Sequence, residues 1–358
     1  MIRPVPSVAG MAAYALSDPV GPGSVSLAQN ESAFPVSPLA LAAGRTALEK
    51  ATLYPDPDWC DLREAIAEVH GIDAAHILCG AGSMELIGSL IRAFAGPGDE
   101  VLGSRYGYLF VATACQQSGA SHVQAPESDF TLSVEAILVA VTARTRIVFV
   151  CNPGNPTGTR IPNQEILRLR EALSPDVLLV VDQAYGEFDG QDPAAILALA
   201  GRGDTVVLRT FSKAYGLAGA RVGWGLFHEA IGKETRKLMN PNNVSGASQA
   251  MAAAAMRDQP HMREVVARTA AVRSTFAATL REAGYRIPDS HTNFVLIPFA
   301  DADVARAADA RLRDAGYLLR GMGGYGLSHC LRATIASAEV MGRAADILVA
   351  FREERDDR

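Results

Sequence analysis

The chain has 358 residues, of which 49% are hydrophobic, and this is enough for one large domain with a smaller companion or for two domains. A net charge of −6 argues against a protein that binds nucleic-acid phosphates. The five cysteines form no CxxC pair and no metal-ligand spacing with histidine, which favours free thiols in a reducing compartment. Because neither a signal-peptide core nor an apolar run of about 20 residues is present, we expect a cytoplasmic protein.

The first part of the chain predicts an arm followed by two helices. Residues 1–35 are rich in Pro, Gly and Ser and are expected to be extended. Apolar periodicity predicts helices over 37–51 and 59–72. The prolines of "YPDPD" (54–58) require a turn between them.

Strand-like and helical runs then alternate, with helices expected at positions such as 83–95 and 163–173. Several strand-like runs are apolar throughout, as strands buried on both faces should be. This pattern predicts an α/β domain with a largely parallel sheet. The strand-like runs are 76–80, 100–104, 146–151, 177–182, 205–210 and 221–227.

The composition and the pattern of predicted elements change after residue 243. One long Ala- and Arg-rich helical stretch over 245–283 precedes a mixture of strands and helices, including helices over 302–315 and 337–354. This part indicates a second, smaller α+β domain. We expect three parts, namely an arm that packs with the small domain, a large cofactor-binding domain and a small C-terminal domain, over 1–35, 36–254 and 255–358.

Polar groups follow several of the predicted strands, and ligands of open α/β sheets gather at these carboxyl ends. In "GAGSMEL", Ser83 and the glycines before it enter a helix, which makes either an anion site or an ordinary capped turn. Asp182 ends an apolar strand, so its carboxylate either holds a cation or a protonated ring nitrogen, or caps the turn. The "NPGNPTG" and "FSK" segments follow two further strands.

Lys213 lies in "TFSKAYGLAGARVGWG" and is one of only four lysines in the chain. A lysine in a dry pocket of small residues loses part of its preference for the charged form and becomes a nucleophile towards carbonyls. The alternative is an ordinary surface lysine on a loop. Ser212 and Arg221 favour the first interpretation, since a hydroxyl, an amine and a fixed cation suit a phosphorylated aldehyde. Pyridoxal 5′-phosphate needs such a lysine, an anion site and a carboxylate for its ring nitrogen.

The sequence resembles fold type I aminotransferases, and within them the histidinol-phosphate aminotransferase branch. The resemblance covers almost the whole chain, and its segments keep the family's order. It implies an aspartate aminotransferase-like fold, in which helices enclose a mostly parallel sheet in the large domain. The segments are "LAQNESAFPVSP", "LYPDP", "ILCGAGSMELIGSLIRAFAGPGDEVL", "VCNPGNPTGTRIP", "VVDQAYGEF", "LRTFSKAYGLAGARVGWG", "SHTNFVL" and "GYLLRGMGGYGLSHCLRATI".

The resemblance assigns cofactor roles to individual residues. Lys213 resembles the lysine that bonds the cofactor aldehyde, and Asp182 resembles the carboxylate on the ring nitrogen. Asn155 and Tyr185 resemble the donors to the phenolic oxygen. The residues that resemble the phosphate cradle are Ala81, Gly82, Ser83, Ser212 and Arg221.

The resemblance implies two tyrosine roles at the cofactor, and for one of these roles two tyrosines are candidates. Tyr108 aligns best with the aromatic that stacks on the ring, and Tyr106 is the competing choice. Tyr54 resembles the tyrosine that contacts the cofactor phosphate of the neighbouring subunit, which implies a homodimer with shared sites.

The resemblance is weaker where the substrate binds. Arg332 resembles the arginine that clamps a substrate carboxylate or phosphate, Arg320 a second anion contact, and Asn30 a further substrate-binding residue. Met84 stands where the branch usually has a polar or acidic residue, and Gly321 where a proline commonly follows the arginine. These departures leave histidinol phosphate, an aromatic amino acid and other anionic amines open as donors.

The resemblance implies a transaminase that returns the amino group to a 2-oxo acid, with 2-oxoglutarate as the expected acceptor. A decarboxylase or lyase on the same scaffold is the alternative. A non-catalytic regulator is disfavoured, because such proteins carry an extra DNA-binding domain. The "GMGGYG" run (321–326) matches a dinucleotide-binding pattern but precedes a strand-like run, so we interpret it as a chance match.

Overall fold

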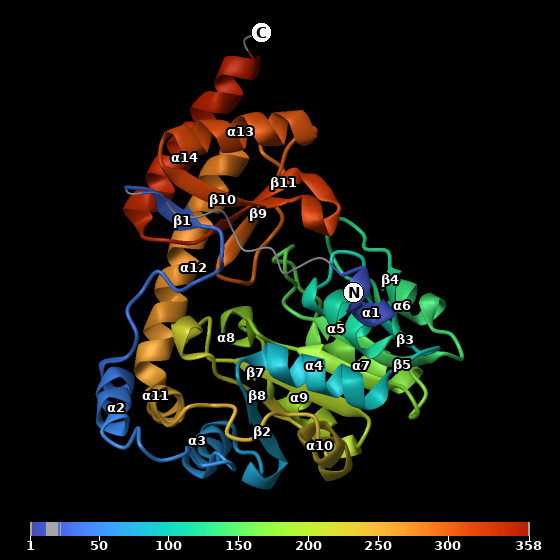
Figure 1. The fold of residues 1–358 in the computed structure, drawn as a ribbon. Coiled ribbons are helices and arrows are strands. Elements are labelled where there is room, and N and C mark those ends of the chain that lie inside the picture. The colour runs from blue at the N-terminus through green and yellow to red at the C-terminus, as the bar shows by residue number, and fades with distance from the viewer. Residues whose placement is uncertain (1, 12–20, 22, 357–358) are drawn as a thin grey trace.

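A seven-stranded sheet and a four-stranded sheet form the framework of the computed structural model (Figure 1). The structure describes residues 2–11, 21 and 23–356. In the larger sheet every strand runs in one direction except β8, which is antiparallel to both neighbours. Its order is β2 (Ile77–Gly80), β8 (Gly223–Leu226), β7 (Thr205–Thr210), β6 (Leu178–Asp182), β5 (Thr145–Cys151), β3 (Glu100–Ser104) and β4 (Ser121–Ala125).

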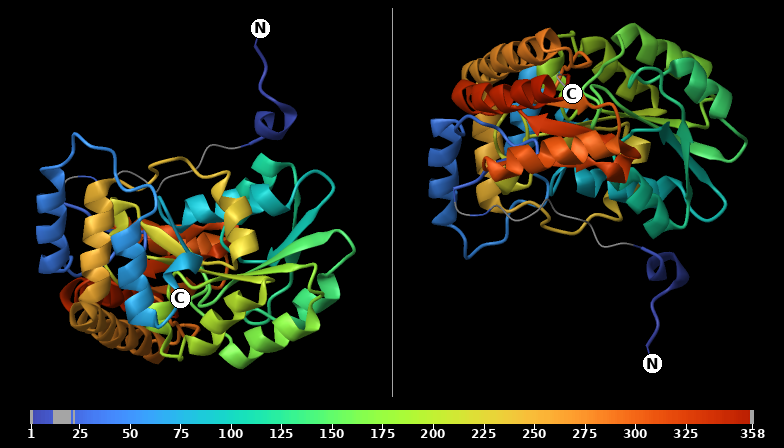
Figure 2. Two further views of the ribbon diagram at one scale, coloured as in Figure 1. Left: turned by 90° about the horizontal axis from the view of Figure 1, so that it is seen from below. Right: turned by 90° about the horizontal axis from the view of Figure 1, so that it is seen from above.

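Helices lie on both sides of this sheet (Figure 2). The central strands are fully buried, and their runs of Val, Leu and Ile suit a strand covered on both faces. The predicted α/β fold with a mostly parallel sheet between helices is confirmed. The flanking helices are α4 (Ser83–Phe94), α5 (Phe110–Ser118), α6 (Val134–Ala140), α7 (Asn163–Ala172), α8 (Gly186–Asp189), α9 (Ala194–Leu199) and α10 (Glu229–Arg236).

Three further helices pack together beside the β2 end of the sheet (Figure 1). They are α2 (Pro38–Leu48), α3 (Cys60–His70) and α11 (Gly246–Arg257). The α2 helix begins where predicted because the Ser37 hydroxyl accepts from two backbone N–H groups and Pro38 occupies the first turn.

The smaller sheet has a separate hydrophobic core. Its order is β1 (Val25–Leu27), β10 (Tyr317–Met322), β11 (Leu327–Thr334) and β9 (Phe294–Pro298). It packs with α12 (Gln259–Glu282), α13 (Ala302–Asp314) and α14 (Ala338–Asp356). The long α12 helix runs from α11 up to this sheet (Figure 1).

The N-terminal segment joins this second unit through β1, which pairs in parallel with β10. Residues 1–35 were expected to be extended, but a short helix, α1 (Pro6–Ala9), precedes β1 and contacts α5, and its proline lies in the first turn, where it is tolerated. Residues 1, 12–20 and 22 of the predicted arm lie outside the described residues. The division at 35/36 and 254/255 stays a prediction.

The structure differs from the sequence predictions in three further places. The helical stretch over 245–283 is two helices, because Asp258 ends α11 and its carboxylate accepts the His261 N–H at the start of α12. The strand expected over 221–227 starts at Gly223, because Arg221 has a left-handed φ of 53°. Strand β4 was not predicted, since its side chains are mostly polar and only partly buried.

Candidate active site

A cavity of about 1060 Å³ opens between the two sheets, beyond the carboxyl ends of β5, β6 and β7. The expected strand ends therefore do converge on one site. Eleven predicted residues line it: Asn30, Ser83, Tyr108, Asn155, Asp182, Tyr185, Ser212, Lys213, Arg221, Arg320 and Arg332. Ala81 and Gly82 lie directly before α4 at the same edge, whereas Tyr54 is 89% exposed and lies outside the cavity.

Lys213 follows β7 and directs its amine into this cavity. Its Nζ donates to the backbone carbonyl of Asn30 at 3.0 Å and lies 5.9 Å from the centre of the Tyr185 ring. Burial, reinforced by the positive charge of Arg332, lowers the pKa of Lys213 to about 7. A large share of this amine is therefore neutral and nucleophilic at neutral pH.

Asp182 ends β6, in register with Cys151 of β5. Its Oδ1 accepts the backbone N–H of Ala184 at 3.0 Å, and the residue is 2% exposed. Burial raises the pKa of this carboxyl to about 7. A carboxylate in such surroundings is costly unless a positive partner approaches it, and a protonated ring nitrogen is a partner of that kind.

The start of α4 and the guanidinium of Arg221 form a cradle for an anion. Gly82 caps the helix with φ 78° and ψ 164°, and a Cβ there would lie 2.4 Å from Nη2 of Arg221. Only glycine therefore allows this close approach. Arg221 donates from Nη1 to the carbonyl of Ala218 at 3.0 Å and to Oγ of Ser212 at 3.4 Å. Helix-start N–H groups beside a guanidinium suit a phosphate.

Glu85 supports this cradle and was not predicted. Its Oε2 accepts the backbone N–H of Ala81 at 2.7 Å and the side-chain amide of Asn243 at 2.6 Å. A glutamate in the first turn that reaches back to the chain before the helix is the recognisable signal in "GAGSMEL".

Arg332 of β11 connects the two sheets at the cavity. It donates from Nη1 to Oδ1 of Asn155 at 2.6 Å and from Nη2 to the carbonyl of Ala28 at 2.9 Å. Because the oxygen of the Asn155 amide accepts from Arg332, its NH₂ group remains as the donor for a ligand.

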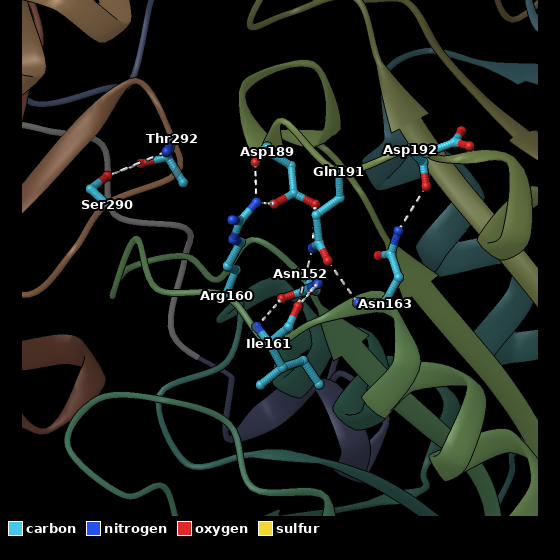
Figure 3. A network of polar contacts seen from close by, with 9 residues as sticks. All are labelled: Asn152, Arg160, Ile161, Asn163, Asp189, Gln191, Asp192, Ser290 and Thr292. Carbon is cyan, nitrogen blue, oxygen red and sulfur yellow. Dashed lines mark hydrogen bonds and ion pairs between the residues drawn. The ribbon is translucent and has the colours of Figure 1, made fainter.

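The loop that carries Asn155 is held at both of its ends (Figure 3). The Asn152 amide donates to the carbonyl of Ile161 at 3.1 Å and accepts its N–H at 2.9 Å. Arg160 donates to Oδ1 of Asp189 at 2.7 Å, which fastens the loop to the end of α8. These contacts fix the position of Asn155 from outside the cavity.

Of the two competing tyrosines, Tyr108 lines the cavity. Tyr106 instead packs towards Phe130, with ring centres 6.2 Å apart, in a small cluster under the β10–β11 turn. The geometry therefore favours Tyr108 as the residue that can face a cofactor ring. The 321–326 run comprises the last two residues of β10 and that same turn into β11.

A family model for aminotransferase class I and II matches residues 22–348. The chain belongs to this family. It is 44% identical to the histidinol-phosphate aminotransferase of Paramagnetospirillum magneticum, over 87% of both chains. It is 40% identical to that of Jannaschia sp., over 98% of both chains. The crystal structure of histidinol-phosphate aminotransferase from Sinorhizobium meliloti in complex with pyridoxal-5′-phosphate superimposes with a TM-score of 0.91, at 30% identity, over 99% of this chain and 98% of that one.

The cavity is also lined by residues of this class I and II aminotransferase that the sequence analysis did not single out. Asp309 and Arg313 of α13 line it and form an ion pair of 2.6 Å between Oδ2 and Nε. The sequence predicted this helix, but it did not indicate which face turns towards the site. Thr334 and Asn293, which hold Asn30, also went unnoticed.

None of the helices within 2–11, 21 and 23–356 has both the length and the apolar character that a membrane crossing requires. In the same part of the chain, His, Cys, Asp and Glu side chains do not gather in groups that could hold a metal ion.

Proposed function

We propose that this chain is a pyridoxal-phosphate-dependent aminotransferase that takes the amino group of histidinol phosphate and passes it to 2-oxoglutarate. The observation that carries the proposal is the pairing of Lys213 and Asp182 in one cavity, each with its pKa brought to about 7 by burial. The names of the relatives support the choice of amino donor.

The residues present fit this cofactor. Because Gly82 has no side chain, Arg221 can lie close to the start of α4, and the two together form a phosphate cradle. The buried carboxyl of Asp182 matches a protonated ring nitrogen, and Tyr108 can cover the ring. The residues proposed to hold the cofactor are Ala81, Gly82, Ser83, Tyr108, Asn155, Asp182, Tyr185, Ser212, Lys213 and Arg221. When bound, pyridoxal phosphate supplies an electron-withdrawing ring that stabilises negative charge at the α-carbon of the donor.

Lys213 is proposed to move the proton in this reaction. Its neutral amine is the base that takes the proton from the α-carbon of the donor. The ammonium so formed then donates this proton to the aldehyde carbon of the cofactor. Because its pKa lies near 7, both the neutral and the protonated amine are populated at neutral pH, as a group that takes up and returns a proton requires.

The arginines at the cavity are proposed to bind the anionic groups of both substrates. Arg332 is 6% exposed and already oriented by Asn155 and Ala28, so it presents a fixed guanidinium. Arg320 of β10 lies opposite Arg332 in the strand register and lines the same cavity. The donor phosphate and the acceptor carboxylates are the groups that such a pair can bind.

A homodimer is proposed, with Tyr54 reaching the neighbouring site. Tyr54 is almost fully exposed, and Leu48 and Leu53, which are close to it in the sequence, are exposed as well. Exposed apolar side chains that gather on one surface mark interaction sites, which is consistent with a partner subunit here. The cytoplasmic location stays a prediction.

The test of the function is an assay of the chain loaded with pyridoxal phosphate. With histidinol phosphate and 2-oxoglutarate, we expect glutamate and the keto product in equal amounts, and a Lys213→Ala variant should form neither. Aromatic amino acids serve as competing donors. Release of CO₂ from an aromatic amino acid, in place of glutamate formation, would point to the decarboxylase alternative, and absence of turnover with every donor would contradict the proposal.

A further inference from the structure

Asn30 lies in the segment between β1 and α2, at the centre of a buried set of hydrogen bonds. Its N–H donates to Oγ1 of Thr334 at 2.9 Å, and its carbonyl accepts from Nζ of Lys213 and from the amide of Asn293, both at 3.0 Å. In the side chain, Oδ1 accepts from the Thr334 hydroxyl at 3.3 Å and Nδ2 donates to the hydroxyl of Tyr185 at 2.8 Å. The residue is 2% exposed.

In the structure the Asn30 amide turns its oxygen to Thr334 and its NH₂ group to Tyr185. The Thr334 hydroxyl accepts the backbone N–H of Asn30 and gives its own single proton to Oδ1, which is consistent with this orientation. The Tyr185 oxygen therefore accepts from Asn30, and the Tyr185 proton has to point elsewhere.

The cavity is the place where that proton can go. Tyr185 lines it, while the edge of Phe294 packs against its ring with centres 5.3 Å apart. Tyr185 is also the residue expected to donate to the phenolic oxygen of the cofactor. An acceptor at the Asn30 position would take the proton that this donation needs.

We propose that Asn30 is a positioning residue, which turns the Tyr185 hydroxyl proton towards the phenolic oxygen of the cofactor and holds the Lys213 amine on its backbone carbonyl. The inference rests on the proposed function and deepens it. Asn30 also lines the cavity, so the expectation that it contacts the substrate stays a prediction beside this role.

The backbone of Asn30 explains why two substitutions separate its roles. Its φ of 55° is left-handed, a region that Asn and Gly tolerate and most residues avoid. Asn30→Gly keeps the carbonyl that holds Lys213 and removes the amide that faces Tyr185. Asn30→Asp keeps the shape of the side chain but offers Tyr185 an acceptor in place of a donor.

The test is a pH titration of the absorption band of pyridoxal phosphate bound to the full chain. A donor to the phenolic oxygen stabilises its negative form and so lowers the midpoint. We expect Asn30→Asp to raise the midpoint by about one pH unit, in the direction of Tyr185→Phe, and Asn30→Gly to raise it by less, because the Tyr185 hydroxyl is then undirected but can still donate. The other titratable or charged groups that face Tyr185, namely Arg332, Lys213, Cys151 and Tyr325, stay the same in all these variants.

A double substitution shows whether Asn30 acts through Tyr185. In a Tyr185→Phe background, Asn30→Gly should move the midpoint little further, because the proton that it directs is gone. Asn242 has the same left-handed backbone, with a φ of 56°, and does not line the cavity, so Asn242→Gly is the matched control and should leave the midpoint unchanged.

The outcomes separate this inference from the function on which it rests. If the wild-type chain binds pyridoxal phosphate but the midpoint stays fixed in both Asn30 variants, the inference is wrong and the function stands. A full-size shift that persists without the Tyr185 hydroxyl also overturns it. If the Asp variant does not fold, the Gly variant decides. A wild-type chain that gives no cofactor band refutes the proposed function itself.

Discussion

Replacing Gly82 by alanine tests the proposed phosphate cradle at its narrowest point. Gly82 has φ 78° and ψ 164°, a combination that is essentially restricted to glycine. A Cβ at this position would lie 2.4 Å from Nη2 of Arg221, so the guanidinium has to move away from the start of α4. The backbone strain acts on folding, and the displaced cation acts on cofactor binding.

The two effects have separate magnitudes. The backbone strain is expected to cost about 1–3 kcal/mol of unfolding free energy in the cofactor-free protein. Loss of one charge-assisted hydrogen bond costs about 1.5–3 kcal/mol, which corresponds to roughly 10–150-fold weaker binding of pyridoxal phosphate. Urea unfolding measures the first effect, and a titration of the cofactor-free protein with pyridoxal phosphate measures the second.

Gly201→Ala is the matched control, since a Cβ there meets nothing within 4 Å and the backbone is not left-handed. It should change neither quantity by a comparable amount. Unchanged stability and unchanged cofactor affinity in Gly82→Ala would refute the reasoning, because both the strain and the approach of Arg221 would then be absent.

Three further predictions concern the buried charges and the dimer. Burial raises the pKa of Asp182, so the folded protein loses stability as the pH rises through about 7 and the buried carboxyl has to ionise. Asp182→Asn should therefore stabilise the cofactor-free protein at pH 8 by about 1–3 kcal/mol in urea unfolding. An unchanged unfolding midpoint would contradict this. The lowered pKa of Lys213 acts in the opposite direction, so stability falls as the pH drops from about 10 to 7, and Lys213→Met should stabilise the cofactor-free protein at pH 6 but not at pH 10 by the same measurement. If Tyr54 reaches the neighbouring site, co-refolding Tyr54→Ala with Lys213→Ala should restore about a quarter of wild-type activity, since half of the dimers then carry one intact site; activity no higher than that of the separate variants would count against the shared site.

Much of the fold could be predicted because the central strands are apolar along their whole length. Such runs occur where helices cover both faces of a sheet, and β6 and β7 are of this kind. Strand β4 was missed because it lies at the edge of the sheet, where few of its side chains are buried. The break at Asp258 was missed because alanine and arginine continue the helical pattern on both sides of it.

The site could be predicted where chemistry depends on one residue at a strand end, as at Asp182 and Lys213. It could not be predicted where two distant segments meet. The contact of Arg332 with Asn155 depends on the placement of β11 against a loop 177 residues earlier. The contact of Asn30 with Tyr185 likewise joins residues 155 apart. Periodicity reports which residues are buried but not which buried segments face each other.

The most direct test of the central claim is to locate the cofactor on the chain. The full chain is incubated with pyridoxal phosphate, reduced with borohydride, digested and mapped by mass spectrometry. The chain has four lysines, at positions 50, 213, 233 and 237, so only a few side chains can carry the label. The account predicts a visible band that shifts on reduction and a stable label on Lys213 alone. A label spread over the other lysines, or no label and no band, would contradict it.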